Sequence, residues 1–250
     1  MSGHSKWASI KHKKAITDSR RGAAFTKLSR HITVAAKTGG GDIEGNPSLA
    51  LAVQKAKDAS MPKDNIQRAI DKGTGAGANE ADFQEVMYEG YGPGGVALLI
   101  EGLTDNRNRT GAEVRSALTK AGGALGEPGS VAYLFDKTGV IVVDAERYSE
   151  DDLLVAVEAG AEDIEADEET LEVLTAPGDL PAVRAALEAA EIDLASAEVV
   201  WRPKTRVEID EEALKKLMRL IETLDESDDV GEVHANFDAP ADVMERVAGG

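Results

Sequence analysis

Residues 140–201 read VIVVDAERYSEDDLLVAVEAGAEDIEADEETLEVLTAPGDLPAVRAALEAAEIDLASAEVVW, and their pattern of apolar segments is the most informative in the chain. Four short apolar segments bounded by turn residues predict strands, at residues 140–144, 163–166, 170–175 and 197–201. Two segments with helical spacing lie between them, at residues 149–159, where Ser149 is the expected cap, and 180–190. The predicted order is βαββαβ, the split-βαβ or ferredoxin-like pattern.

The segments on either side of this unit predict a second sheet. Before it, we expect strands at 83–91, 96–103 and 131–135 and a helix from about residue 111, with Thr110 and Glu113 as its capping box. After it, a helix at 211–224 and a strand at 232–237 are expected to return to the sheet begun at Phe83. Residues after Ala239 are expected to be frayed. The βαββαβ unit would then be an insertion in a discontinuous middle domain.

The first 75 residues predict a small helical domain behind a mobile leader at residues 1–16. An apolar stripe at helical spacing indicates a helix from about 20 to 37, formed by Phe25, Leu28, Ile32 and Ala35. Asn46-Pro47 is typical of a cap followed by the first residue of a second helix. A short third helix contains Ile66, Ala69 and Ile70, and we expect Gly73 to close it. The glycine-rich residues 73–79 are typical of a linker.

These patterns together predict an α+β protein with a three-helix domain first and two ferredoxin-like α+β domains after it, one inserted in the other. The expected limits are 1–78 for the leader and helical domain, 79–136 plus 206–240 for the discontinuous domain, and 137–205 for the insertion.

The amino-acid composition excludes several kinds of functional site. Cysteine is absent from the 250 residues, which excludes disulfides, thiolate nucleophiles and Cys-ligated zinc. The start of the chain has no apolar run of a secretory signal, and the longest apolar stretch, residues 96–100, is too short to span a membrane. We therefore expect a cytoplasmic protein without a membrane partner.

Charge is distributed unevenly along the chain. Residues 1–37 hold nine Lys or Arg and one acid, Asp18, so their net charge is +8. The remaining residues have a net charge of −26, which gives −18 for the whole chain. Acidity of the body is explained by solubility alone. The basic segment instead indicates an arm that binds nucleic acid on an acidic body.

The basic segment supplies most of the candidate nucleic-acid contacts. Its cations can neutralise phosphates and release counterions, and an aromatic side chain among them can stack on a base. The alternative is that the tryptophan folds back on the helical domain and that the lysines are ordinary solvated charges. The candidates are Lys6, Trp7, Lys11, His12, Lys13, Lys14, Arg20, Arg21, Lys27, Arg30 and Lys37.

A second candidate site lies at residues 106–110 (NRNRT), expected just before a helix. Arg107 and Arg109 beside free N–H groups are suited to phosphate or RNA. Arginine serves equally well in salt links, so the alternative is that both bridge the acidic body.

No enzyme motif is found. His4, His12, His31 and His234 lack metal-binding spacing, and neither a G-x-S-x-G elbow nor a Walker loop occurs. The glycine-rich residues 90–95 precede a strand and predict a hairpin turn. We therefore expect no catalytic residue, metal, cofactor or small-molecule substrate.

Five segments of the chain resemble the YebC/PmpR family, to which the mitochondrial translational activator of cytochrome c oxidase also belongs. They are MSGHSKWASIKHKK, RRGAAFTKLSRHITVAAKTGG, NPSLALAVQKAKDASMPKDNIQRAIDKGTG, YEGYGPGGVALLIEGLTDNRNRT and GGALGEPGSVAYLF. The similarity runs to DDVGEVHANFD near the end. Departures are Ser9 in place of the usual Asn, Gly231-Glu232 in place of Gln-Asn/Asp, and His234 in place of Tyr.

The resemblance implies a three-domain α/β protein of the cytoplasm, described as a DNA-binding transcriptional regulator. It also implies a competing role, because some members resemble ribosome-associated translation factors. Charge and residue type alone slightly favour RNA, since no helix-turn-helix is evident and a flexible basic arm suits structured RNA. An adaptor that binds proteins through its acidic domains is a third hypothesis. Our prediction is a DNA-binding transcriptional regulator, with a translation factor that binds ribosomal RNA or the ribosome as the alternative.

Overall fold

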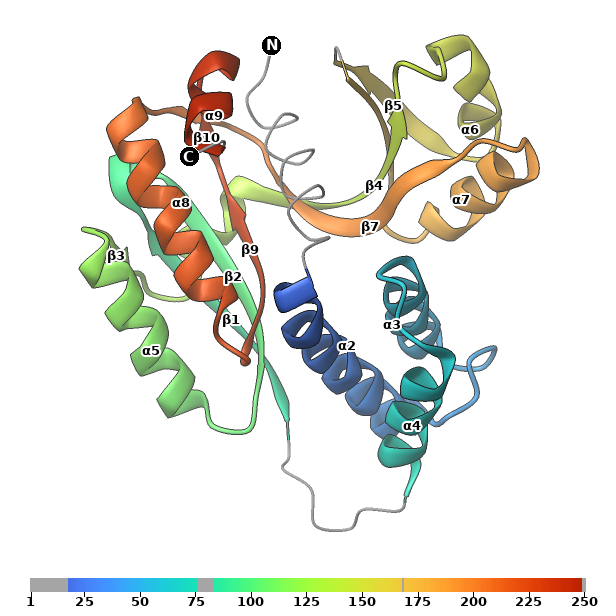
Figure 1. Cartoon of the computed structure of the whole chain (residues 1–250), viewed down its shortest axis with the longest axis horizontal. Helices are drawn as coiled ribbons and strands as arrows, with labels where there is room; N and C mark the ends of the chain where they lie inside the picture. Colours follow the sequence, from blue (N-terminus) through green and yellow to red (C-terminus); the bar gives the residue numbers. More distant parts are fainter. Residues whose placement is uncertain (1–17, 76–82, 168, 249–250) are drawn as a thin grey trace.

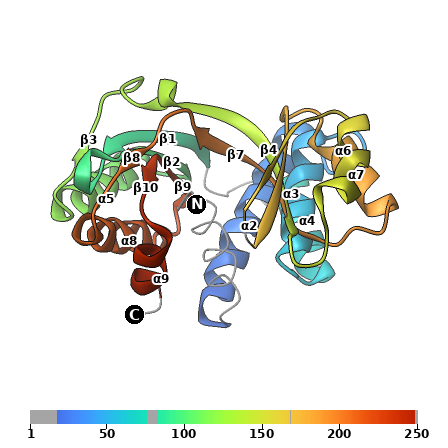
Figure 2. The ribbon, with the colours of Figure 1, turned by 90° about the horizontal axis from the view of Figure 1, so that it is seen from above.

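The structure is a computed structural model that describes residues 18–75, 83–167 and 169–248. Three lobes are visible in Figure 1: a helical lobe, a middle lobe that contains the C-terminal elements, and an inserted lobe. Seen from above, the middle lobe lies on one side, and the helical and inserted lobes lie together on the other (Figure 2). Helix α2 of the helical lobe faces the middle lobe. The α+β class predicted from the sequence is confirmed.

The helical lobe consists of α2 (Asp18–Gly39), α3 (Pro47–Asp58) and α4 (Lys63–Thr74). Its core includes Ile32 of the predicted stripe, with Leu49 and Ile70 from the other two helices. Asn46 caps α3 by accepting from the Leu49 N–H at 3.1 Å, and its amide also donates to two carbonyls at the end of α2. One side chain therefore fixes the turn between two helices.

Gly73 lies inside α4 and does not close it, so that detail of the prediction is wrong. The helix ends at Thr74, and the cap is Gly75 with φ of 142°. Gly73 is the point of closest approach between α4 and α2: a Cβ there would be 2.4 Å from the Thr33 carbonyl oxygen. The glycine permits helix contact and is not a stop signal.

Replacing Gly73 with alanine should lower the free energy of unfolding by about 2 kcal/mol, because the methyl group overpacks a backbone contact. Gly22→Ala in α2 is the matched control. No atom lies within 4 Å of a Cβ at Gly22. That change should therefore raise stability by about 0.5–1 kcal/mol through helix propensity. Urea unfolding of both variants provides the measurement, and equal effects would contradict the packing role of Gly73.

The middle lobe is an antiparallel sheet of order β3-β1-β2-β9. Its strands are β1 (Gln84–Tyr91), β2 (Ala97–Thr104), β3 (Ala124–Leu125) and β9 (Val230–Ala235). A 3-10 turn at Pro93–Gly95 joins β1 to β2. Helices α5 (Arg107–Lys120) and α8 (Glu211–Asp225) cover one face, where Leu98, Leu118 and Leu217 form part of the core. As expected, the C-terminal strand pairs with β2.

The inserted lobe has the predicted βαββαβ order. Its strands are β4 (Phe135–Asp144), β5 (Ala161–Ala166), β6 (Thr170–Thr175) and β7 (Leu194–Pro203), paired antiparallel in the order β5-β6-β4-β7. Helices α6 (Leu154–Glu158) and α7 (Leu180–Ala189) pack on this sheet, and a 3-10 turn at Glu150–Leu153, capped by Ser149, leads into α6. The exact domain limits at residues 78, 136, 205 and 240 stay a prediction.

Three further local expectations are wrong. Residues 131–135 are not a separate strand, because Ala132–Leu134 form a 3-10 turn and Phe135 opens β4. Helix α5 begins at Arg107 with Asn106 as its cap, so Thr110 is a buried residue of its first turn and caps nothing. Residues 241–248, which were expected to be frayed, form α9 (Ala241–Ala248). This helix follows β10 (Phe237–Asp238), which pairs with β8 (Val207–Glu208). That helix is ordered because Met244 is only 2 % exposed in the middle core.

The 3-10 turn before β4 depends on the buried carboxylate of Glu89. It accepts backbone N–H groups of Gly129, Val131 and Ala132 at 2.6–2.8 Å. Burial acts to raise the pKa of Glu89, but the three donors outweigh it, and the net shift is downward. The ionised side chain thus stabilises the loop between β3 and β4.

Glu89→Gln should cost about 2 kcal/mol of unfolding free energy at pH 7, since an amide cannot accept from all three donors. The pKa of Glu89 is lower in the folded than in the unfolded state. Its contribution is therefore complete above the ordinary glutamate pKa of about 4 and is lost as pH falls through the lower folded value. Urea unfolding from pH 7 to 3 should show the difference between wild type and variant shrinking. A difference independent of pH would contradict this role.

Candidate nucleic-acid interface

The predicted contact residues fall into two groups. Most lie outside the described residues or have undescribed side chains: Lys6, Trp7, Lys11, His12, Lys13, Lys14, Arg20 and Arg21. The structure describes the side chains of Lys27, Arg30, Lys37, Arg107 and Arg109. It brings Lys27, Arg30 and Arg109 together around one acidic loop.

Two cations of α2 bind the loop that connects α8 to β9. Lys27 Nζ donates to the Asp225 carbonyl oxygen at 2.6 Å. Arg30 donates to the Asp228 carbonyl oxygen at 2.7 Å and to Asp229 Oδ1 at 3.2 Å, and its guanidinium lies 5.2 Å from the Phe83 ring centroid. This side of α2 therefore joins the helical lobe to the middle lobe, whereas Lys37 is exposed in the last turn.

The second predicted site lies in the first turn of α5. Arg109 donates to Asp105 Oδ1 at 2.8 Å and to Asp229 Oδ2 at 2.6 Å. These hydrogen bonds raise the pKa of Arg109 above its ordinary value. Arg107 is exposed and forms no ion pair with the described residues. The salt-link interpretation therefore describes Arg109, and Arg107 is available for another partner.

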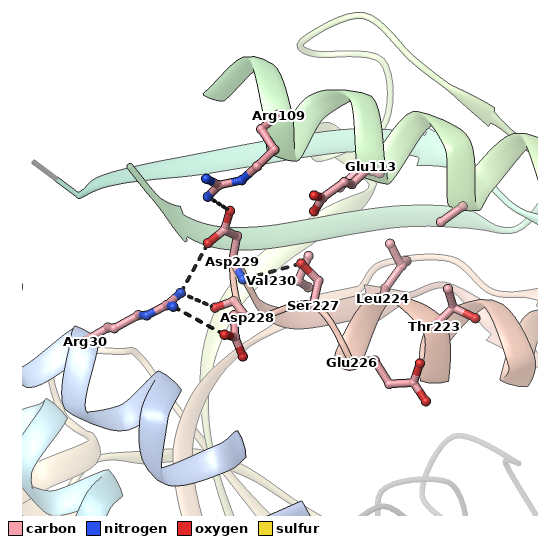
Figure 3. Close-up of a pocket in the computed structure, with 12 residues that line it drawn as sticks. Arg30, Arg109, Glu113, Thr223, Leu224, Glu226, Ser227, Asp228, Asp229 and Val230 are labelled. Carbon is pink, nitrogen blue, oxygen red and sulfur yellow. Dashed lines mark hydrogen bonds and ion pairs between the residues drawn. The ribbon is translucent and has the colours of Figure 1, made fainter. Parts of the chain in front are cut away.

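Asp229 is the centre of this junction. Figure 3 shows Arg30 and Arg109 converging on its carboxylate from two lobes of the molecule. The side chain is 7 % exposed and also accepts from the buried hydroxyls of Thr104 and Thr110 at 3.1 and 2.8 Å. Burial acts to raise the pKa of Asp229, but Arg109 and the two hydroxyls outweigh it, and the pKa is lowered.

A hollow of about 480 Å³ lies beside this junction, between α5 and the end of α8 (Figure 3). Its lining mixes Arg30 and Arg109 with the acids Glu113, Glu226 and Asp228. A phosphate would have to displace carboxylates that already satisfy both arginines. The hollow is therefore poorly suited to a polyanion in this arrangement.

A second junction joins all three lobes, and no sequence motif predicts it. Lys55 of α3 forms a close hydrogen bond with Glu232 of β9 and lies 3.5 Å from Glu198 of β7. Arg184 of α7 binds Asp58 of α3 with hydrogen bonds of 2.8 and 3.0 Å. Lys55 and Arg184 therefore also form ion pairs between lobes, and neither was a predicted site residue.

The acidic charge is concentrated in the inserted lobe. Residues 137–205 hold eighteen Asp or Glu against five Lys or Arg. This lobe would repel a polyanion, so any nucleic acid must approach from another side. Among the described residues, no helix is both long and apolar enough to cross a bilayer.

Comparisons with known proteins cover nearly the whole chain. Residues 5–76 match the model described as the TACO1/YebC protein N-terminal domain, and residues 83–237 match that of the TACO1/YebC second and third domain. A probable transcriptional regulatory protein from Rubrobacter xylanophilus is 55% identical over the full length of both chains. One of the same name from Acidothermus cellulolyticus is 54% identical over 99% of this chain and all of its own.

A solved structure has the same fold. The crystal structure of a conserved hypothetical protein from Aquifex aeolicus is 48% identical, with a TM-score of 0.83. The alignment covers 94% of this chain and 97% of the other. Each of these matches includes the basic leader, the lobes that follow it in the sequence, or both.

Proposed function

Since this chain belongs to the TACO1/YebC family, we propose that it is a DNA-binding transcriptional regulator whose basic leader makes the principal contacts with DNA. The observation that carries this proposal is the excess of nine cations over one acid in residues 1–37, attached to a body of charge −26. Relatives that cover the whole chain carry the name of probable transcriptional regulatory proteins, which supports a regulatory and non-enzymatic role.

The contacts within the molecule refine which cations are available. Lys27, Arg30 and Arg109 bind the loop between α8 and β9, so they contribute to affinity only if that loop is displaced. Arg107 is exposed, and it extends the contact surface proposed for Lys6, Lys11, Lys13 and Lys14. The leader therefore carries most of the proposed binding energy.

Binding of this kind is mainly electrostatic. Each neutralised phosphate releases counterions, so affinity should fall steeply with salt. The acidic inserted lobe limits the geometry, because a long duplex can approach only where that lobe faces away. In the proposed complex, the basic leader therefore binds the DNA and the three lobes make few contacts with it.

Crosslinking in cells tests the proposal. The full chain is crosslinked and purified, and all bound nucleic acid is sequenced without selecting DNA or RNA. Discrete promoter DNA is expected. Recovery of ribosomal RNA in place of promoter DNA would overturn the transcriptional assignment and establish the alternative, a translation factor. A leader variant with Lys11, Lys13 and Lys14 changed to Glu, processed in parallel, gives the background.

A further inference from the structure

Three potential metal ligands lie on one face of two adjacent strands. Glu101 of β2 and Glu232 of β9 are directly opposite each other in the register, and His234 follows Glu232 by two residues. Side chains two residues apart on a strand share a face. This face is opposite to the one covered by α5 and α8, because Val233 between the two ligands belongs to the core under those helices. The strand pairing alone therefore brings the three side chains together.

One nitrogen of the His234 imidazole, Nε2, lies buried between two carboxylates. The His234 side chain is 8 % exposed, and no group of the described residues forms a hydrogen bond with Nε2. Nε2 lies 3.7 Å from Glu101 Oε2 and 3.8 Å from Glu232 Oε2. A buried polar atom without a partner is costly and calls for an explanation such as an absent ion. Here the atom points between two carboxylates that are too far away for hydrogen bonding.

Each carboxylate has one oxygen held by a neighbouring residue and the other directed at His234. The Trp201 indole N–H donates to Glu101 Oε1 at 2.6 Å, and Lys55 Nζ binds Glu232 Oε1. The Oε2 atoms of both glutamates are the ones that face the imidazole. Outer hydrogen bonds that orient ligating side chains in this way are typical of metal sites.

Two carboxylates that face each other across the strands also favour a cation here. Like charges directly opposite each other on neighbouring strands are destabilising, and Glu101 and Glu232 form such a pair. Glu198 adds a third carboxylate 3.5 Å from Lys55. Lys55 reaches Glu198 and Glu232 from the helical lobe. A divalent ion between Glu101 and Glu232 would relieve their mutual repulsion.

We propose that Glu101, Glu232 and His234 bind one divalent transition-metal ion of the zinc type. One imidazole nitrogen and two carboxylate oxygens are ligands that zinc accepts, and the candidate ligand atoms of all three residues lie within 4.8 Å of one another. Glu101 keeps 35 % of its side chain exposed, which gives the ion a route from solvent and a side for a fourth ligand.

The position of the site gives the ion a structural role. Lys55 comes from the helical lobe, Trp201 and Glu198 come from the inserted lobe, and the three ligands come from the middle lobe. An ion bound here orders the side chains through which all three lobes meet. Binding should therefore raise the thermal stability of the whole chain, since only the folded state brings the ligands together.

Zinc titration of the full chain, freed of metal by a chelator, tests the site. Calorimetry should show saturable binding of one Zn²⁺ per chain, with a rise in Tm. His234→Phe and, separately, Glu101→Gln should each weaken binding by about 100-fold or more while circular dichroism stays unchanged. Glu101→Gln keeps the side-chain volume, so it remains informative if His234→Phe fails to fold. X-ray absorption of the zinc-bound chain should show one imidazole ligand with oxygen ligands.

Two controls separate this site from other zinc-binding groups. Changing His4 and His12 to Gln removes the leader histidines and should leave the stoichiometry and affinity unchanged. Glu198→Gln removes a carboxylate of the same cluster that is not a proposed ligand, and it should retain one tightly bound ion. Absence of saturable binding, or equal binding by folded His234→Phe and wild type, would show an adventitious ion only and overturn the proposal.

Discussion

Replacing Asp229 with alanine is expected to lower the free energy of unfolding by about 3 kcal/mol. The carboxylate is 7 % exposed and is shared by Arg30 of the helical lobe and Arg109 of the middle lobe. Removing one member of a buried ionic cluster leaves its partners desolvated and unpaired, which costs several kcal/mol. Here solvent reaches both arginines, so the cost stays near the lower end of that range.

Urea unfolding, followed by tryptophan fluorescence, measures this effect at pH 7. Asp228→Ala is the matched control, because Asp228 is adjacent in the chain and its carboxylate lies 3.5 Å from the same arginine. Its side chain is 60 % exposed, so the loss should be about 0.5 kcal/mol or less. Similar losses for the two variants would show that Asp229 is not the residue that holds the junction.

Changing Lys11, Lys13 and Lys14 together to Glu is expected to abolish measurable nucleic-acid binding at physiological salt. Three phosphate contacts are lost and three repulsive charges replace them. At low salt, where residual binding is measurable, the slope of log K against log salt should become shallower by about 3, the change expected for three phosphates on duplex DNA. Fluorescence anisotropy with a labelled duplex, titrated from low to moderate salt, measures both quantities.

The comparison variant reverses three exposed lysines elsewhere, Lys120, Lys204 and Lys216, which gives the same change in total charge. It should bind nearly as well as wild type if position decides affinity, and much more weakly if net charge alone decides it. Thermal stability of the leader variant should not change. Full retention of DNA and RNA affinity by a chain without its first sixteen residues would contradict the role of the leader.

Local periodicity was sufficient to predict most of the fold. The strand at 170–175 and the cap at Asn46 were predicted from spacing and residue type alone, because both depend on neighbouring residues. Two errors, at 131–135 and in the C-terminal helix, have a tertiary origin. The first segment is shaped by Glu89, some forty residues earlier, and the second is ordered by burial of Met244 against the middle core.

Side-chain partners could not be predicted from the sequence. The two arginines that looked like phosphate contacts share Asp229, which lies 199 residues from Arg30 and 120 from Arg109. His234 had no metal-binding spacing because its proposed co-ligand Glu101 becomes its neighbour only through strand pairing. The sequence alone shows that positive charge is concentrated in the first 37 residues. Only the structure shows which of the cations form ion pairs between lobes.

The pairing of β9 with β2 has a consequence for biosynthesis. Leu98 and Ala235 are partners in this sheet although more than 130 residues separate them. The helical lobe and the insertion draw on contacts nearer in sequence and can form while translation continues. The central sheet must wait until residues 230–235 have been synthesised, so the edge of the apolar strand β2 that pairs with β9 stays open in the nascent chain until then.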